Sequence, residues 1–233
     1  MHTTIPTPQL IAFDADDTLW DNESFFRQAE HDLCTVLSAY ADATTVIDEL
    51  YKIEVSNMAD YGYGAIAFIM SMIENAVKVS KGKIPSEAIL RIIESGRNVL
   101  HMPATPYPGV TDTLRQLKDS GRYQLVLFTK GELLTQENKI ARSGLAGFFD
   151  RVVIVSDKTE QEYRSLCTTS GIAPARFLMV GNSLKSDILP ALNIGASAIH
   201  IPSAHTWQHE VIAPFTHPRL LHLTTFPQLL TIL

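Results

Sequence analysis

Three carboxylates stand within four residues directly after an apolar run, and this cluster constrains the chain more than any other feature. The apolar run covers residues 10–13, and the acids are Asp14, Asp16 and Asp17. Acidic side chains gathered at the end of a strand destabilise the folded state unless positive charge lies beside them. Mg²⁺ supplies such charge and prefers one or two carboxylates together with water and a substrate phosphate. The cluster therefore predicts a metal-assisted site at the end of a buried strand.

Size and charge narrow the class of protein. The 233 residues suffice for one sizeable domain or for a core domain with an insertion. Apolar residues make up 45% of the chain, which is typical of a folded soluble protein. The net charge of −6 and the absence of any run of Lys and Arg argue against a nucleic-acid partner.

Cysteine usage and hydropathy indicate the compartment. Cys34 and Cys167 lie far apart without metal-ligand spacing, so we expect two buried, reduced thiols. The first residues show no basic segment followed by an apolar one. The longest apolar stretch, 65–73, is far shorter than the roughly 20 residues of a membrane span. These features predict a cytoplasmic protein without a membrane partner.

Two patterns divide the chain. Residues 22–103 show helical spacing of apolar positions and no strand pattern. Elsewhere, apolar runs of strand length alternate with short amphipathic segments. We expect strands at 9–13, 124–128, 151–155, 177–180 and 198–201, and helices at 110–118, 132–142, 159–170 and 187–193. Such alternation predicts an α/β core of residues 1–21 and 104–233, with a parallel sheet covered by helices on both faces.

Polar side chains follow four of the expected strands. Ligands of open parallel sheets bind outside the carboxyl ends of the strands. Any one of these residues alone is equally well explained as a loop residue or a helix cap, but their ordered occurrence indicates one site. The groups, in chain order, are Asp14 with Asp16, Thr129 with Lys130, Asp157 with Lys158, and Gly181-Asn182-Ser183 with Asp187.

This ordered set resembles the haloacid dehalogenase-like superfamily, most closely its phosphatases. Asp14-Ala15-Asp16-Asp17-Thr18 fits the DxDxT motif that those proteins carry after the first strand. Thr129 matches their Ser or Thr after the second core strand, and Lys158 matches their Lys near the third or fourth. Residues 181–187 look like a variant of their fourth motif, a Gly followed by spaced acids. The resemblance spans nearly the whole chain and implies a Rossmann-like core with an inserted all-α cap domain at 22–103.

The resemblance also implies an activity, that of a phosphatase acting on a small phosphorylated metabolite. In this interpretation Asp14 attacks the phosphorus and forms an aspartyl-phosphate that water later hydrolyses. Asp16 protonates the leaving oxygen and then activates the water. Thr129 and Lys158 hold the phosphoryl oxygens, with Lys158 supplying positive charge to the transition state. Asp17 and Thr18 take no part in the chemistry, and Thr18 fixes the turn.

Mg²⁺ is the cofactor that the resemblance implies. Its ligands would be Asp14, the main-chain carbonyl of Asp16, and Asn182 with Asp187. Asn182 departs from the family, which usually has Asp there, because an amide oxygen can bind the ion but brings no charge. Asp187 is then the alternative ligand. Lys158 is also followed by Thr159 rather than by the Pro that the family often has.

Other functions remain open beside the phosphatase. Dehalogenases of the superfamily lack a carboxylate at Asp16, which favours phosphate chemistry. A phosphomutase uses the same pair of acids, and a non-catalytic metabolite- or partner-binding member would explain Asn182. A signalling receiver has no place for the helical insertion and carries its acceptor Asp on a later strand. The oligomeric state is open between monomer and homodimer.

Two further segments have alternative interpretations. Tyr61-Gly62-Tyr63-Gly64 is either a substrate-contacting turn of the insertion or a simple helix start. His205 and His209 have the i, i+4 spacing of a zinc pair on a helix, near Trp207. Because no third ligand is evident, a loop at the edge of the site or a surface helix is the favoured interpretation.

Overall fold

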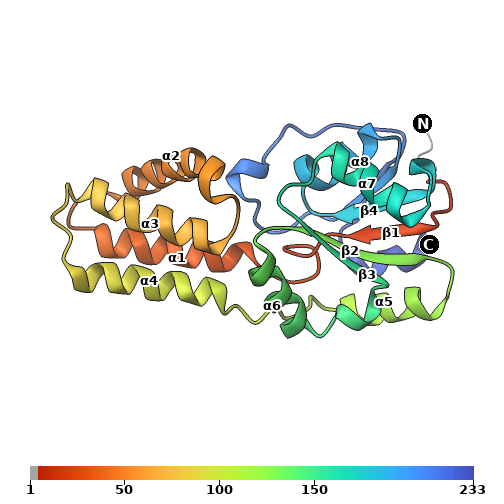
Figure 1. Ribbon diagram of the computed structural model, residues 1–233, viewed down its shortest axis with the longest axis horizontal. Coiled ribbons are helices and arrows are strands. Elements are labelled where there is room, and N and C mark those ends of the chain that lie inside the picture. The colour runs from red at the N-terminus through yellow and green to blue at the C-terminus, as the bar shows by residue number, and fades with distance from the viewer. Residues whose placement is uncertain (1–4) are drawn as a thin grey trace. The chain divides into compact units, whose positions relative to one another are not determined.

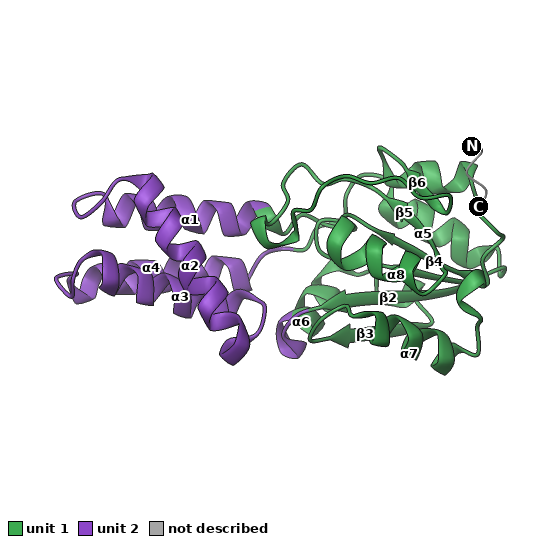
Figure 2. Ribbon diagram, turned by 90° about the horizontal axis from the view of Figure 1, so that it is seen from above, with its two compact units in different colours: residues 1–23, 104–130, 136–233 green, residues 24–103, 131–135 purple. Residues whose placement is uncertain are grey.

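The computed structural model describes residues 5–233, which fall into two compact units (Figure 2). Unit 1 holds the described residues up to Glu23 together with Ala104–Lys130 and Gln136–Leu233. Unit 2 holds Ser24–Pro103 and Gly131–Thr135. The role of unit 2 as a cap over a catalytic core stays a prediction.

Unit 1 is built on a six-stranded sheet in the order β3-β2-β1-β4-β5-β6, and every pair of neighbours is parallel (Figure 1). The strands are β1 (Leu10–Phe13), β2 (Gln124–Lys130), β3 (Arg151–Val155), β4 (Phe177–Gly181), β5 (Ser197–His200) and β6 (Leu220–His222). Phe13 pairs with Leu127 of β2 and Val180 of β4, so the first strand is central. The predicted α/β fold class is confirmed, whereas the three-residue β6 is too short to leave a pattern in the sequence.

Helices cover both faces of this sheet. Alternate residues of β1 point to opposite faces, and all four are fully buried. Ile11 and Phe13 pack against α5 (Val110–Asp119), α6 (Leu133–Ser143) and the short helix Phe226–Thr231. Leu10 and Ala12 pack against α7 (Glu160–Ser170) and α8 (Leu189–Asn193). Burial on both faces explains the near-continuous apolar runs of β1, β2 and β4, whereas the edge strand β3 is partly exposed.

Residues 24–103 of unit 2 are built from four helices and contain no strand. They are α1 (Glu23–Leu37), α2 (Ala43–Tyr61), α3 (Ala65–Val79) and α4 (Ser86–Leu100). Their apolar faces form a separate core that includes Leu33, Leu50, Phe68 and Ile92. The residues at helical spacing in the sequence are those that meet in this core.

The two cysteines and the apolar helices bear on two simpler expectations. Both cysteines are free thiols, but only Cys167 is buried, so the expectation of burial was wrong for Cys34. Cys34 lies on a partly exposed flank of α1, where its sulfur faces the Ala43 carbonyl. Among residues 5–233, no helix combines the length and apolarity needed to traverse a bilayer.

Candidate active site

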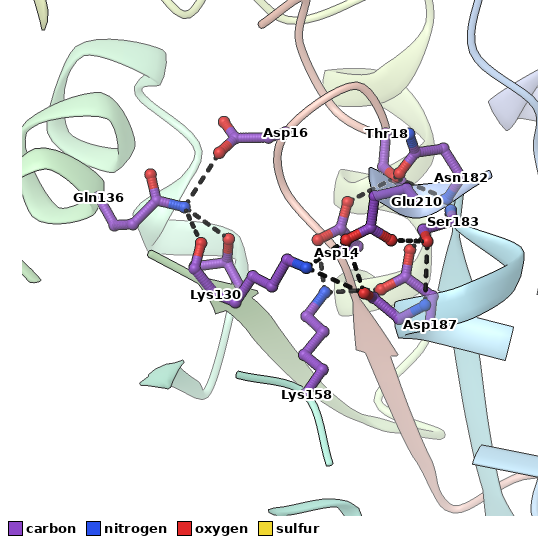
Figure 3. Close-up of polar contacts among 12 residues, drawn as sticks. Asp14, Asp16, Thr18, Lys130, Gln136, Lys158, Asn182, Ser183, Asp187 and Glu210 are labelled. Carbon is purple, nitrogen blue, oxygen red and sulfur yellow. Dashed lines mark hydrogen bonds and ion pairs between the residues drawn. The ribbon is translucent and has the colours of Figure 1, made fainter. Parts of the chain in front are cut away.

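The acidic cluster lies at the carboxyl end of the sheet, beside the ends of β2 and β4 (Figure 3). Asp14 immediately follows β1, and its N–H donates to the Val180 carbonyl at 2.9 Å. Because β1 lies between β2 and β4, residues more than a hundred positions apart meet here. Thr129 lies inside β2 rather than after it, since that strand extends to Lys130.

Lys158 joins two of the carboxylates. Its Nζ lies 2.5 Å from Oδ1 of Asp14 and 2.7 Å from Oδ1 of Asp187, and its side chain is 1% exposed. Burial, reinforced by the Asp187 charge, raises the pKa of Asp14 to about 7 even though Lys158 opposes the shift. Burial disfavours the charged amine, but both carboxylates outweigh it and raise the pKa of Lys158 above its usual range. One cation therefore serves two buried acids, and Asp14 needs further positive charge to be fully ionised at neutral pH.

Thr18 brings the Asn182 amide next to Asp14. The Thr18 hydroxyl donates to Oδ2 of Asp14 at 2.8 Å and accepts the Asn182 N–H at 3.1 Å. The side-chain oxygen of Asn182 lies 3.2 Å from the same hydroxyl. Two oxygen donors thus converge on one point, and oxygen donors are what Mg²⁺ prefers.

Asp187 is engaged by the protein on both oxygens. Oδ1 accepts from Lys158, and Oδ2 accepts the Ser183 N–H at 2.9 Å. The Asn182 side-chain oxygen instead faces the Thr18 hydroxyl. Which of the two residues binds the ion stays a prediction. Asp187 is better placed to hold Lys158.

The turn that carries Asp187 is a π-helical turn, Leu184–Ile188, followed by α8. The sequence pattern predicts an α-helix from residue 187, but the wider turn precedes it. The Ser183 side chain accepts the Ser186 N–H at 2.9 Å, and the buried Tyr163 hydroxyl donates to the Ser186 carbonyl at 2.9 Å. Such turns occur often at functional sites.

Gly181 leaves the space that Asp187 fills. A Cβ at residue 181 would lie 2.3 Å from Oδ2 and 2.4 Å from Cγ of Asp187. We expect Gly181→Ala to displace Asp187 from Lys158, to lower kcat/KM at least tenfold, and to lower the free energy of unfolding by about 1–3 kcal/mol. Urea unfolding and steady-state kinetics measure both effects. Gly147→Ala is the matched control, because nothing lies within 4 Å of its added methyl; equal behaviour of the two variants would contradict the prediction.

Asp16 faces away from Asp14 and toward α6 (Figure 3). Its Oδ2 lies 2.5 Å from Nζ of Lys139 and 3.0 Å from Nε2 of Gln136, while Oδ1 accepts from the Trp20 indole at 2.8 Å. Gln136 also donates to the Thr129 hydroxyl at 2.7 Å. Sequence reasoning missed both α6 residues. The available signal was a Gln and a Lys, three residues apart, on the inward face of a helix where apolar residues are expected.

The Asp17 side chain binds backbone N–H groups of the turn before α1 and does not contact the other acids. Its backbone is left-handed (φ 61°), and its Oδ1 accepts the N–H groups of Asn22 and Glu23, each at 3.0 Å. Burial raises its pKa to about 7, although those two N–H groups oppose the shift. The carboxylate therefore caps the entry to α1 at a cost in desolvation.

We expect Asp17→Asn to keep catalytic activity and to be more stable than wild type above pH 7. Between pH 3.8 and about 7 the folded state binds more protons at Asp17 than the unfolded state. The free energy of unfolding therefore falls as pH rises through this window. Asn carries no charge, accepts the same N–H groups and tolerates positive φ. Thermal unfolding at pH 5 and pH 8 in EDTA checks the prediction, and a variant less stable than wild type at pH 8 would contradict it.

A partly buried ion pair lies beside the turn after β4. Glu210 accepts from Lys130 and from the hydroxyls of Ser183 and Ser186 (Figure 3). The side chains of Lys130 and Glu210 are 18% and 11% exposed. The sequence indicated Lys130 only as a strand-end residue and did not indicate its partner, which lies 80 residues away.

The histidine segment around 205–209 and the segment 61–64 had two interpretations each. The chain around His205 and His209 forms only a single 3₁₀ turn, Gln208–Glu210, so their spacing does not place them on one helical face. Among the described residues, no group of three or more His, Cys, Asp or Glu side chains is arranged to hold a metal ion. Gly62 and Gly64 both have positive φ and form the joint between α2 and α3, in keeping with the helix-start interpretation.

Comparison with known proteins places this arrangement in a family. The profile of haloacid dehalogenase-like hydrolases matches residues 8–195. The chain belongs to the haloacid dehalogenase-like hydrolases. The predicted family membership is thereby confirmed.

Named relatives of this hydrolase are phosphatases. It is 30% identical to a glyceraldehyde 3-phosphate phosphatase of Methanothermobacter thermautotrophicus, over 84% of this chain and 86% of the relative. It is 27% identical to a pyrimidine 5′-nucleotidase of Escherichia coli, over 91% and 94% of the two chains. A haloacid dehalogenase-like hydrolase from Xanthomonas campestris superposes with a TM-score of 0.84 at 36% identity, covering 96% of this chain and 91% of that structure. These relatives support the prediction of an enzyme of the phosphoric monoester hydrolase class.

Proposed function

We propose that this protein is a Mg²⁺-dependent phosphatase that hydrolyses a small phosphorylated metabolite through an aspartyl-phosphate on Asp14. The observation that carries the proposal is the buried Lys158 between Asp14 and Asp187 at the carboxyl end of β1. The glyceraldehyde 3-phosphate phosphatase, the pyrimidine 5′-nucleotidase and a human N-acylneuraminate-9-phosphatase, 25% identical over 81% of this chain, support the substrate class.

The charges around Asp14 explain why a divalent cation is needed. The site holds four carboxylates, and each lysine beside them is already paired with one or two of these acids. The acids are Asp14, Asp16, Asp187 and Glu210, and the lysines are Lys130, Lys139 and Lys158. A phosphate dianion entering such a site would meet net negative charge. Mg²⁺ held by Asp14, Asn182 and the Asp16 carbonyl would neutralise the phosphoryl group and so permit attack by a carboxylate.

The residues then act in two half-reactions. An Asp14 oxygen attacks phosphorus while the ester P–O bond breaks, and the leaving oxygen takes a proton from the Asp16 carboxyl group. Water next attacks the phosphorus of the acyl phosphate, giving its proton to Asp16 as the bond to Asp14 breaks. Because Asp16 faces Lys139 and Gln136, its side chain must rotate to reach the leaving oxygen. Lys158 and the Thr129 hydroxyl hold the phosphoryl oxygens.

Phosphate release tests this function directly. We expect purified protein to hydrolyse 4-nitrophenyl phosphate with Mg²⁺, to lose the activity in EDTA, and to regain it when Mg²⁺ is restored. A panel of sugar, nucleotide and acid phosphates ranked by kcat/KM then defines the substrate. Organic product that retains phosphate would indicate the phosphomutase, whereas no turnover of any ester would indicate the non-catalytic member.

A further inference from the structure

Glu210 is a partly buried carboxylate that reaches the site from a segment without long secondary structure. It belongs to the 3₁₀ turn Gln208–Glu210, between β5 and β6. Its Oε1 accepts from Nζ of Lys130 and from the Ser186 hydroxyl, the latter at 2.8 Å, and its Oε2 accepts from the Ser183 hydroxyl. Nζ of Lys130 also lies 3.0 Å from the Ser186 oxygen. Side chains from three separate parts of the sequence therefore close one network.

The chain from the end of β5 to Glu210 contacts the turn after β4 at two further points. Nε2 of His200 lies 2.9 Å from the Asn182 carbonyl, and Nζ of Lys185 donates to the His209 carbonyl at 2.7 Å. Residues 200–210 thus hold residues 182–186 through three independent sets of hydrogen bonds. Glu210 also forms an ion pair with Lys130, at the end of β2.

The two serines connect Glu210 to the residues that matter for catalysis. Ser183 follows Asn182, and its N–H holds Oδ2 of Asp187 at 2.9 Å. Ser186 precedes Asp187, and its N–H donates to the Ser183 hydroxyl at 2.9 Å. A shift of either serine therefore moves Asn182 or Asp187. Lys130 ends β2 and directly follows Thr129, so its bond to Glu210 joins the network to the end of that strand.

We propose that Glu210 is a positioning residue that holds the turn 182–187 in register with the end of β2, and thereby sets the places of Asn182 and Asp187. The inference rests on the proposed function for its kinetic consequence. Its structural consequence, an ordered turn, does not depend on catalysis. Removing one partner of a partly buried ion pair leaves an uncompensated charge, whereas removing both does not. Comparing the single and double variants therefore distinguishes a loss of stability from a loss of positioning.

Three variants test the proposal: Glu210→Gln, Lys130→Met and the double variant that combines them. We expect Glu210→Gln to increase amide hydrogen exchange in residues 182–187. Mg²⁺ affinity, measured by calorimetry, and kcat/KM should each fall by about tenfold or more. In the double variant the thermal midpoint should recover toward wild type, while exchange and kcat/KM stay impaired. Glu94→Gln, an exposed change on α4, is the control and should alter none of these.

Each outcome bears on one hypothesis. Unchanged exchange in residues 182–187, with kcat/KM within about twofold of wild type, would show that Glu210 contributes only to stability and would overturn the proposal. Full kinetic recovery in the double variant would also overturn it. If wild type hydrolyses no ester, the phosphatase proposal fails, and the exchange measurement still decides the role of Glu210.

Discussion

Asp14→Asn is expected to lower the rate of phosphate release by roughly a thousandfold or more, while the protein stays folded. The amide cannot form the acyl phosphate, so both half-reactions are lost. The fold should tolerate the change because the carboxylate is buried and its pKa is already raised to about 7. Above that pH, Asn removes a charge that the folded state holds unfavourably relative to the unfolded state.

Kinetics, mass spectrometry and circular dichroism together check the Asp14→Asn prediction. Wild type quenched in acid during turnover should carry a phosphoryl adduct, which the variant should lack. Asp17→Asn makes the same chemical change three residues away, where the side chain only caps a turn, and should retain activity. Comparable loss in both variants would show that the turn, rather than the nucleophile, had been tested. An active Asp14→Asn variant would refute the aspartyl-phosphate mechanism.

Lys158→Met is expected to lose both activity and stability. Without the ammonium group, Asp14 and Asp187 face each other in a site where all three side chains are at most 9% exposed. Breaking a buried pair by removing one partner costs about 3–5 kcal/mol, and here the lost cation served two acids. The phosphoryl group also loses its fixed positive charge, which should lower kcat/KM at least a hundredfold.

The stability loss in Lys158→Met should depend on pH. Removing the positive charge raises the pKa of Asp14 further, so the folded variant takes up protons more readily as pH falls. The difference in unfolding free energy from wild type is therefore largest at pH 8 and smaller at pH 5.5. Urea unfolding at both values measures it. Lys52→Met, which removes an exposed lysine of α2, should stay within about 0.5 kcal/mol of wild type at both; a pH-independent loss in Lys158→Met would contradict the electrostatic explanation.

Features that depend on neighbouring residues were predictable. Strands buried on both faces leave apolar runs, and amphipathic helices leave apolar positions at a fixed spacing, so the parallel sheet and the all-helical insertion follow from local patterns. Asp14, Thr129, Lys158 and Asp187 were predicted because they occur in a recognisable order at or after the expected strands. The carboxyl ends of parallel strands lie at one edge of the sheet, which is why those residues meet.

Features that depend on side-chain pairing over long distances were not predictable. Lys139 and Gln136 hold Asp16 from α6, and Glu210 holds Lys130 and two serines from a segment without long secondary structure. A charged residue in a loop or on a helix leaves the same signal whether it is solvated or buried in an ion pair. The π-helical turn at Leu184–Ile188 likewise depends on the Tyr163 hydroxyl and on the space beside Gly181.

By itself, the sequence determined the fold class, the family and the acidic cluster after the first strand, because each depends on short patterns of neighbouring residues. Only the tertiary structure decided how the three carboxylates of the opening cluster divide. Asp14 pairs with Lys158, Asp16 with Lys139, and Asp17 with backbone N–H groups. It also placed the Asn182 oxygen at the Thr18 hydroxyl that donates to Asp14, and the two Asp187 oxygens at Lys158 and at the Ser183 N–H. The physical reason is that the strand order determines which distant charged side chains lie in contact. At low solvent exposure, each such contact contributes strongly to the free energy of the folded state.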